Sequence, residues 1–316
     1  MRILFVTANR VGDAVLSSGL LVYLTERHPD ARITIAVGPA AASLFKNAPG
    51  LERLIILEKA RWSLHWFSLW TKCILHQWDI IVDLRRSALA YLLLAQKRYV
   101  VPKARLGMHR VELIAETLMG NLPTPTPVLW PDDIVTNLSK YTPTIAIGPA
   151  ANWDGKQWRS ERFGELAKRL ISENGPFPGA HVAVIAAANE YDQVEPVLRA
   201  VPKDNLINLV GAGDLAVVGA YIRQCKFFVG NDSGLMHMAA AAGIPTLGLF
   251  GPSRNEHYAP WGHACAYIRT PESYDELVSV EGYDHRTTGT LMDGLSIEAV
   301  FNACLALAER TRRSER

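Results

Sequence analysis

Short apolar runs alternate along this chain with longer stretches in which apolar residues recur at helical spacing. In the first part of the chain, the runs predict buried strands at residues 2–7, 33–37, 54–57, 79–84 and 99–101. The stretches between them predict helices at residues 14–27, 40–46, 88–96 and 111–119. Regular alternation of this kind is typical of a doubly wound α/β domain built on a parallel sheet.

The alternation starts again after a break near the middle of the chain. Residues 121–131, NLPTPTPVLWP, contain four prolines and fit neither period, so they predict a linker. Beyond this break, strands are expected at residues 144–147, 181–186, 206–209, 227–230 and 246–250, and helices at residues 160–173, 191–200, 214–224, 233–242 and 297–309. We therefore predict α/β domains at residues 1–122 and 144–295, a linker at 123–143, and a C-terminal helix at 296–316.

Residues 226–253 form the most informative stretch, because they predict a β-α-β unit. Its helix starts after the first strand, with Asp232 at the expected N-cap and Gly243 at the stop. At such a helix start, unpaired backbone N–H groups and the helix dipole favour an anion. Gly234 leaves room for a ligand, and Ser233 and His237 share one helical face. The alternative is that Asp232 is only a cap and His237 only a core histidine.

Composition excludes several classes of protein. The 316 residues carry a net charge of +2, which gives no reason to expect a nucleic-acid partner. The four cysteines have no C-x-x-C spacing, so neither a disulfide framework nor a zinc site is predicted. The absence of G-x-G-x-x-G argues against a nicotinamide-dependent dehydrogenase. No apolar run has the length of a signal-peptide core or a membrane span, and we expect a cytoplasmic protein.

Candidate chemical groups lie near the predicted strand ends. Asp13 starts the helix after the first strand, and Lys156 lies in the loop of residues 148–158. A carboxylate can take a proton, and a lysine can neutralise phosphate oxygens. The alternatives are a simple helix cap and a solvated lysine. Basic residues near strand ends of the first domain suit an acidic ligand, with ordinary surface positions as the alternative; they include Arg10, Arg85, Arg86, Arg105, His109 and Arg110.

The order of motifs in residues 229–253 resembles glycosyltransferase family 9, the heptosyltransferases of lipopolysaccharide core synthesis. The motifs are Asp232-Ser233-Gly234-x-x-His237, an Ala-rich helix, Gly243-x-Pro245 and Phe250-Gly251-Pro252. Residues 11–18 and 148–158 also resemble family motifs. The resemblance implies a GT-B fold, in which two Rossmann-like doubly wound parallel-sheet domains face each other across a cleft. It also implies that the last helix returns to the N-terminal domain.

The resemblance assigns roles to the candidate residues. Asp13 is the implied general base of an inverting displacement, and Lys156 the implied phosphate-binding group. The implied donor site also holds Asn152, Asp232, Ser233, Gly234, His237 and, at the ribose, Glu190. The acceptor site would use Arg10, Arg85, Arg86 and Arg110. This chain departs from the family pattern at Thr7, Ala150, Ala151 and Ser253, where Lys or Arg, hydroxyl residues and Thr are common.

Residues 61–78, RWSLHWFSLWTKCILHQW, hold four of the eight tryptophans. As one helix they would place a basic stripe beside a broad apolar face; the stripe comprises Arg61, His65, Ser68, Lys72 and His76. Such a helix suits the surface of a membrane. A crossover helix buried against its own sheet is the alternative.

The resemblance, together with these observations, implies an inverting, metal-independent glycosyltransferase without a cofactor. It would move a heptose or related sugar from an ADP-linked donor to a lipid-linked, acidic lipopolysaccharide core acceptor, in peripheral contact with the inner membrane. The alternatives are a GT-B-like sugar-nucleotide epimerase or hydrolase, and an inactive nucleotide-sugar-binding protein.

Overall fold

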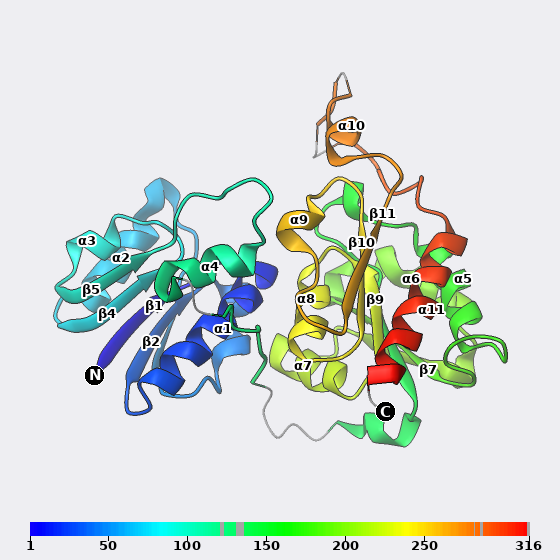
Figure 1. Cartoon of the computed structure of the whole chain (residues 1–316), viewed down its shortest axis with the longest axis horizontal. Coiled ribbons are helices and arrows are strands. Elements are labelled where there is room, and N and C mark those ends of the chain that lie inside the picture. Colours follow the sequence, from blue (N-terminus) through cyan, green and yellow to red (C-terminus); the bar gives the residue numbers. More distant parts are fainter. Residues whose placement is uncertain (121–122, 131–135, 281, 285–286, 315–316) are drawn as a thin grey trace. The chain divides into compact units, whose positions relative to one another are not determined.

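The chain folds into two compact α/β units, Met1–Asp132 and Asp133–Arg316 (Figure 1). The computed structural model describes residues 1–120, 123–130, 136–280, 282–284 and 287–314. Each unit contains one parallel sheet, as the alternation of strands and helices predicted.

The N-terminal unit has a five-stranded sheet in the order β3-β2-β1-β4-β5. Its strands are β1 (Arg2–Val6), β2 (Arg32–Val37), β3 (Leu51–Ile56), β4 (Trp78–Asp83) and β5 (Ala95–Val100). Its helices are α1 (Val11–Arg27), α2 (Leu64–Cys73), α3 (Leu89–Leu92) and α4 (Arg110–Met119), with 3₁₀ helices at Pro39–Phe45 and Arg61–Ser63. The strand order reverses between β1 and β4, and at such a switch point the crevice beyond the strand ends is open to ligands.

The C-terminal unit has a six-stranded sheet in the order β11-β10-β9-β6-β7-β8. Its strands are β6 (Thr144–Gly148), β7 (His181–Ala186), β8 (Leu206–Val210), β9 (Phe227–Asn231), β10 (Thr246–Phe250) and β11 (Cys265–Arg269). Its α-helices are α5 (Ser160–Ile171), α6 (Tyr191–Ala200), α7 (Leu215–Arg223), α8 (Gly234–Ala241), α9 (Asn255–Tyr258), α10 (Tyr274–Val278) and α11 (Ile297–Ser314). Short 3₁₀ helices cover Asn137–Tyr141, Asp154–Lys156, Ala188–Glu190 and Lys203–Asn205. The switch point of this sheet lies between β6 and β9.

Some predicted elements differ from the structure. The helix predicted at residues 88–96 is only α3, because residues 95–100 form the edge strand β5. Arg98 stabilises the turn between them by donating to the carbonyl oxygens of Ala90, Leu93 and Ala95. Residues 39–45 are a 3₁₀ helix rather than an α-helix. Strand β11 was not predicted, because its residues are only partly buried and lack a clear apolar run.

The predicted face of α2 is also wrong. Residues 61–78 do not form one helix, since Trp78 already begins β4. His65 belonged to the predicted basic stripe, but its side chain is buried. It lies one turn before Leu69 and two turns before Cys73, which are buried as well. The side of α2 that packs on the sheet therefore includes this histidine, and the stripe is not a single exposed surface.

The predicted linker is divided between the units. Residues 123–130 pack on the N-terminal unit, where the Val128 N–H donates to Ser18 Oγ at 2.8 Å. Gly19 permits this close approach, because a Cβ there would lie 2.7 Å from the Pro125 carbonyl oxygen. Residues 136–143 belong to the C-terminal unit, where Gln224 contacts Thr136. Residues 121–122 and 131–135 lie outside the described residues.

Helix α11 packs within the C-terminal unit, contrary to the expectation that it returns to the N-terminal domain. Val300, Cys304 and Leu307 are buried in the same apolar core as β9 and β10. Arg310 in its last turns donates to the Cys265 carbonyl oxygen of β11 at 2.8 Å. These residues form an apolar face at i, i+4 and i+7, and this face is buried against the sheet of the C-terminal unit.

Asn231 fixes the loop that follows β6. This residue ends β9 and is fully buried. Its Oδ1 accepts from the Trp158 N–H at 3.1 Å, and its Nδ2 donates to the Pro149 carbonyl oxygen at 2.7 Å. One buried amide therefore holds both ends of the loop of residues 149–158, which carries Lys156.

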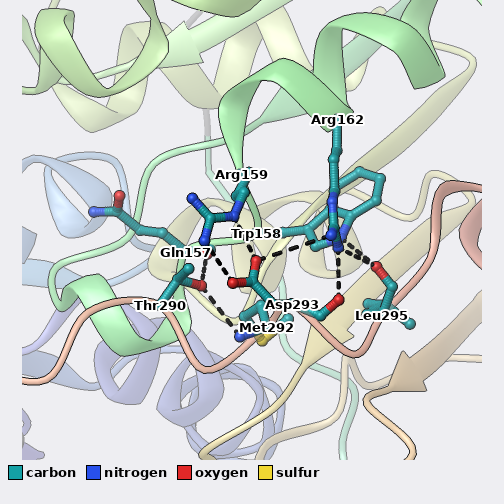
Figure 2. A network of polar contacts seen from close by, with 8 residues as sticks. All are labelled: Gln157, Trp158, Arg159, Arg162, Thr290, Met292, Asp293 and Leu295. Atoms are coloured by element: carbon teal, nitrogen blue, oxygen red, sulfur yellow. Dashed lines mark hydrogen bonds and ion pairs between the residues drawn. The ribbon is translucent and has the colours of Figure 1, made fainter.

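A polar network fastens the same loop from the other side (Figure 2). Arg159 donates through two nitrogens to the two carboxylate oxygens of Asp293, each at 2.5 Å. Arg162 donates to the carbonyl oxygens of Asp293 and Leu295 at 2.9 and 2.8 Å, and Trp158 Nε1 donates to the latter at 2.8 Å. The hydrogen bonds from Arg159 lower the pKa of the Asp293 carboxyl. The segment of residues 290–295 is thereby attached to the start of α5.

Asp83 has the corresponding position in the N-terminal unit. This carboxylate ends β4 and is fully buried. It accepts hydrogen bonds from the Arg85 and Ser87 N–H groups, each at 2.8 Å, and from Ser87 Oγ at 2.7 Å. These bonds hold the turn in which Arg86 adopts a positive φ of 54°.

We expect Asn231→Leu to lower the free energy of unfolding by about 2–4 kcal/mol, because the Trp158 N–H and the Pro149 carbonyl would be left buried without partners. Urea denaturation measures the change. Asn208→Leu is the matched control: Asn208 lies in β8 of the same unit, but it is exposed and water can replace its contacts. Equal losses for the two variants would contradict the role of Asn231.

We expect Asp293→Asn to lower the melting temperature at pH 7. Because the pKa of Asp293 is lower in the folded protein than its ordinary value of 3.8, its contribution is present above that value. It is lost as the pH falls below 3.8 through the folded-state pKa. The melting temperatures of variant and parent should therefore converge in acid, whereas Asp204→Asn, at an exposed carboxylate, should match the parent throughout. A difference that persists at the acid end would refute this account.

Candidate functional site

Lys156 and Asp232 meet at the switch point of the C-terminal unit. Lys156 ends the 3₁₀ helix in the loop after β6, and Asp232 directly follows β9. Lys156 Nζ lies 2.5 Å from Asp232 Oδ2, and the two side chains are 23% and 7% exposed. An ammonium has three N–H donors, so this contact leaves two for a ligand. The structure thus brings together two residues that the sequence placed 76 positions apart.

The start of α8 lies beside this ion pair. Its N-cap is Ser233, not Asp232 as predicted, and the Ser233 side chain makes no capping hydrogen bond. Ser233 Oγ is buried and has no hydrogen-bond partner among the described residues, and the same holds for Ser253 Oγ after β10. Buried hydroxyls without partners are uncommon in folded proteins. The two hydroxyls are therefore available to hydrogen-bond a ligand beyond the ends of β9 and β10, and Gly234 has no side chain to obstruct it.

His237 lies one turn after Ser233, as the spacing predicted, but its side chain is only 4% exposed. Its ring contacts Tyr258 edge-on, with centroids 6.5 Å apart. This packing agrees with the alternative of a core histidine that supports α8. A direct contact with a ligand stays a prediction.

Asn152 and Glu190 lie in the loops after β6 and β7. Asn152 is exposed, whereas the neighbouring Ala150 and Ala151 are buried and take the place of hydroxyl residues. Glu190 Oε2 accepts a hydrogen bond from the Ala187 N–H at 2.8 Å, which closes the turn before α6. Glu190 therefore serves as a local cap in this structure, and its predicted contact with a ribose stays untested.

In the N-terminal unit, Asp13 faces Arg110. Helix α1 starts three residues earlier than predicted, so that Arg10 is its N-cap and Asp13 lies in its first turn. Arg110 begins α4, and its Nε lies 3.5 Å from Asp13 Oδ1. Both side chains are about one-fifth exposed, at 21% and 20%. A carboxylate that solvent reaches thus lies beside a fixed positive charge at the carboxyl end of β1.

Arg85 connects the loops after β1 and β4. Its Nη1 donates to Asn9 Oδ1 at 2.7 Å, and its guanidinium lies over the Trp66 ring, 5.3 Å from the centroid. Arg86 and Arg10 are exposed. The predicted basic residues therefore differ in setting: Arg85 and Arg110 are held by neighbours, while the other two face solvent.

Sequence reasoning missed Asn9, Trp66, Asp83 and Asn231. Asn9, Asp83 and Asn231 lie at or just after strand ends, and this position is the sequence feature that could have identified them. Their partners are far along the chain, however, so the contacts could not be inferred. The described residues contain no group of three His, Cys, Asp or Glu side chains arranged to hold a metal ion. They also contain no helix with the length and apolar character needed to cross a membrane.

The geometry provides two separate clusters, one in each unit. The C-terminal cluster offers an ammonium, a helix start and unpaired hydroxyls, which suit an anion such as a diphosphate. The N-terminal cluster offers a carboxylate and guanidinium groups, which suit proton transfer and binding of an acidic molecule.

Comparison with known proteins points to one family. A model described as glycosyltransferase family 9 (heptosyltransferase) matches residues 84–282. Lipopolysaccharide heptosyltransferase 2 of Escherichia coli (strain K12) is 32% identical over 177 residues, which cover 50% of this chain and 49% of that protein. The matched region of this chain thus spans about half the length of such curated relatives.

Solved structures show the same fold over nearly the whole chain. The Escherichia coli ADP-heptose lipopolysaccharide heptosyltransferase II has a TM-score of 0.73 at 22% identity, with 99% of this chain and 100% of that chain covered. An Escherichia coli heptosyltransferase with ADP-2-deoxy-2-fluoro heptose has a TM-score of 0.71 at 20% identity, with 97% and 99% covered. The predicted GT-B class of two parallel-sheet domains is confirmed. From its match to the family model over more than half its length, this chain belongs to glycosyltransferase family 9, the heptosyltransferase family.

Proposed function

We propose that this chain is an inverting glycosyltransferase that moves a heptose from an ADP-linked donor to a lipopolysaccharide core acceptor. The observation that carries the proposal is the Lys156–Asp232 pair at the β6/β9 switch point, in a chain of family 9. The names of the relatives support the substrate class, since they describe heptosyltransferases and one was solved with an ADP-heptose analogue.

The donor would bind to the C-terminal cluster. Lys156 and the N–H groups at the start of α8 would stabilise the diphosphate, and Ser233 Oγ would gain the hydrogen bond that it lacks in this structure. Asp232, held by Lys156, would accept hydrogen bonds from hydroxyls of the sugar and orient it. Asn152 would add a polar contact at the loop, and Glu190 would reach the ribose after releasing its cap contact.

The acceptor would bind to the N-terminal cluster. Asp13 would take the proton of the acceptor hydroxyl while that oxygen attacks the anomeric carbon on the face opposite the diphosphate. The bond from the anomeric carbon to the phosphate oxygen breaks, and ADP leaves with the bonding electrons. Arg85, Arg86, Arg110 and Arg10 would bind acidic groups of the acceptor. The reaction therefore requires one group from each unit.

Positive side chains and the helix start take the role that a divalent metal has in many glycosyl transfers, so we propose that transfer needs no metal and no cofactor. Resistance of the activity to EDTA tests this part. Cytoplasmic location and peripheral contact with the inner membrane follow from the nature of the acceptor. An epimerase or hydrolase would consume the donor without an acceptor, and an inactive binding protein would not consume it.

Asp13→Asn should lower kcat for transfer by about 10²–10⁴-fold, because the amide cannot accept the proton. Donor affinity should stay unchanged, since the donor cluster lies in the other unit. Acceptor-dependent release of ADP measures turnover, and calorimetry measures donor binding. Asp30→Asn, at an exposed turn of the same unit, is the control. Full activity of Asp13→Asn, or ADP release that is independent of acceptor, would reject the proposed mechanism.

Lys156→Met should lower kcat/KM for the donor by about 100-fold, because a positive charge beside the leaving diphosphate is lost. The matched control is Lys168→Met on α5, where the side chain is 49% exposed and lies at the surface. Initial rates at varied donor concentration measure the effect. If both variants lose the same activity, Lys156 has no specific part in donor binding.

A further inference from the structure

The solvent side of α2, α3 and the residues that flank these helices carries several exposed apolar side chains. We define the α2–α3 apolar surface by its residues, which are Trp62, Leu64, Phe67, Leu75, Tyr91, Leu92 and Leu94. Each is more than half exposed, and Trp62 and Leu75 reach 90%. Exposed apolar residues scattered singly are ordinary, but a group on two neighbouring elements indicates an interaction site.

The two helices form a single supported platform. They lie side by side in the N-terminal unit (Figure 1), and Trp70 Nε1 on α2 donates to the Leu92 carbonyl oxygen on α3 at 3.3 Å. The inner sides of both helices are buried in one core, which includes Leu69, Cys73 and Leu93. Their remaining apolar residues therefore point outward because the inward positions are already filled.

The backbone holds these side chains in place. Trp62 and Ser63 have positive φ values of 55° and 58°, which are uncommon for residues other than glycine. This turn leaves Trp62 in solvent ahead of α2. On the α3 side, the three hydrogen bonds from Arg98 to backbone carbonyls fix the turn that presents Leu92 and Leu94. The exposed groups are thus part of an ordered frame.

The segment that carries the apolar surface is mainly basic, although exposed Glu58 directly precedes it and Glu116 pairs with Arg105 at 3.1 Å. Residues 59–110 contain ten Lys or Arg, two Asp and no Glu, in a chain whose net charge is only +2. Asp83 is buried, and Asp79 is partly buried and accepts hydrogen bonds from the Arg2 N–H and from Gln96. Eight of the basic residues are exposed, namely Lys59, Arg61, Lys72, Arg86, Lys97, Arg98, Lys103 and Arg105.

We propose that the α2–α3 apolar surface docks on an anionic lipid bilayer. Tryptophan, tyrosine and leucine enter the headgroup boundary, while surrounding lysines and arginines bind anionic lipid headgroups. A second copy of this chain is a poorer occupant, because an isologous dimer would bring two strongly positive surfaces together. Buried positive charges would then face each other without counterions.

The surface adjoins the candidate acceptor cluster through one contact. Trp66 on α2 lies under the guanidinium of Arg85, which is bonded to Asn9 in the loop after β1. A lipid-anchored acceptor in the docked bilayer would therefore emerge next to the arginines assigned to it. This last step rests on the proposed function, whereas the docking itself does not.

Vesicle binding by the full chain, without donor or acceptor, tests the proposal. We expect binding to vesicles of phosphatidylcholine and phosphatidylglycerol (3:1), weaker binding in 0.5 M NaCl, and little binding to pure phosphatidylcholine. The triple variant Trp62→Ser/Phe67→Ser/Leu92→Ser should weaken binding at least about tenfold, since it removes three apolar side chains from the surface. Arg61→Gln/Lys72→Gln should weaken it about fivefold per charge.

The control variant is Tyr191→Ser/Val280→Ser, which removes two exposed apolar side chains from the C-terminal unit and should bind as the parent does. Unchanged thermal unfolding shows that each variant is folded. Transfer to a water-soluble acceptor saccharide should be equal for parent and triple variant, so failure of the catalytic proposal and failure of docking are distinguishable.

Three results would overturn the docking proposal. The first is equal binding of parent and triple variant to anionic vesicles, and the second is no binding by either. The third is a dimer of the parent and a monomer of the triple variant in sedimentation velocity, with no vesicle binding, which would identify a second copy as the occupant.

Discussion

Parallel strands end at one edge of their sheet, and this constraint determines where chemistry can occur in both units. The strand order reverses between β1 and β4 and between β6 and β9, and at such switch points the two adjacent connections leave in opposite directions. Ligands of open α/β sheets bind at this place, beyond the carboxyl ends of the strands. Asp13 and Arg85 lie at the first point, Lys156 and Asp232 at the second. The contact between Lys156 and Asp232 follows from strand order, since the two residues are 76 positions apart in the sequence.

Buried polar side chains give these loops a fixed shape. Asn231 and Asp83 each end a strand. Asn231 binds backbone groups of the loop of residues 149–158, and Asp83 binds backbone N–H groups of the turn that directly follows it. The Arg159–Asp293 contact adds a second attachment to the loop that carries Lys156. Charged side chains near these loops are already paired within the protein, as Lys156 is with Asp232. Binding of a ligand would therefore replace existing contacts and would not have to order a mobile segment.

The N-terminal unit carries two kinds of surface. Its strand ends are polar and charged, while the outer side of α2 and α3 is apolar and bordered by cations. The cation–π contact between Arg85 and Trp66 lies between the strand ends and the outer side of α2. This arrangement is suited to a molecule that is itself divided into an acidic head and an apolar anchor.

The sequence by itself determined the strands and helices with clear periods, such as β7, α6 and the unit of residues 227–250, because apolar spacing reports burial directly. It also located Asp13, Lys156 and Asp232 at strand ends. Tertiary structure decided the rest. The edge strands β5 and β11 have weak apolar periods because their residues are at most partly buried. His65 is buried despite its polar side chain, and α11 packs on the sheet of its own unit. The pairings Lys156–Asp232, Asp13–Arg110 and Arg85–Trp66 depend on which distant segments the sheets bring together, and no local pattern records that information.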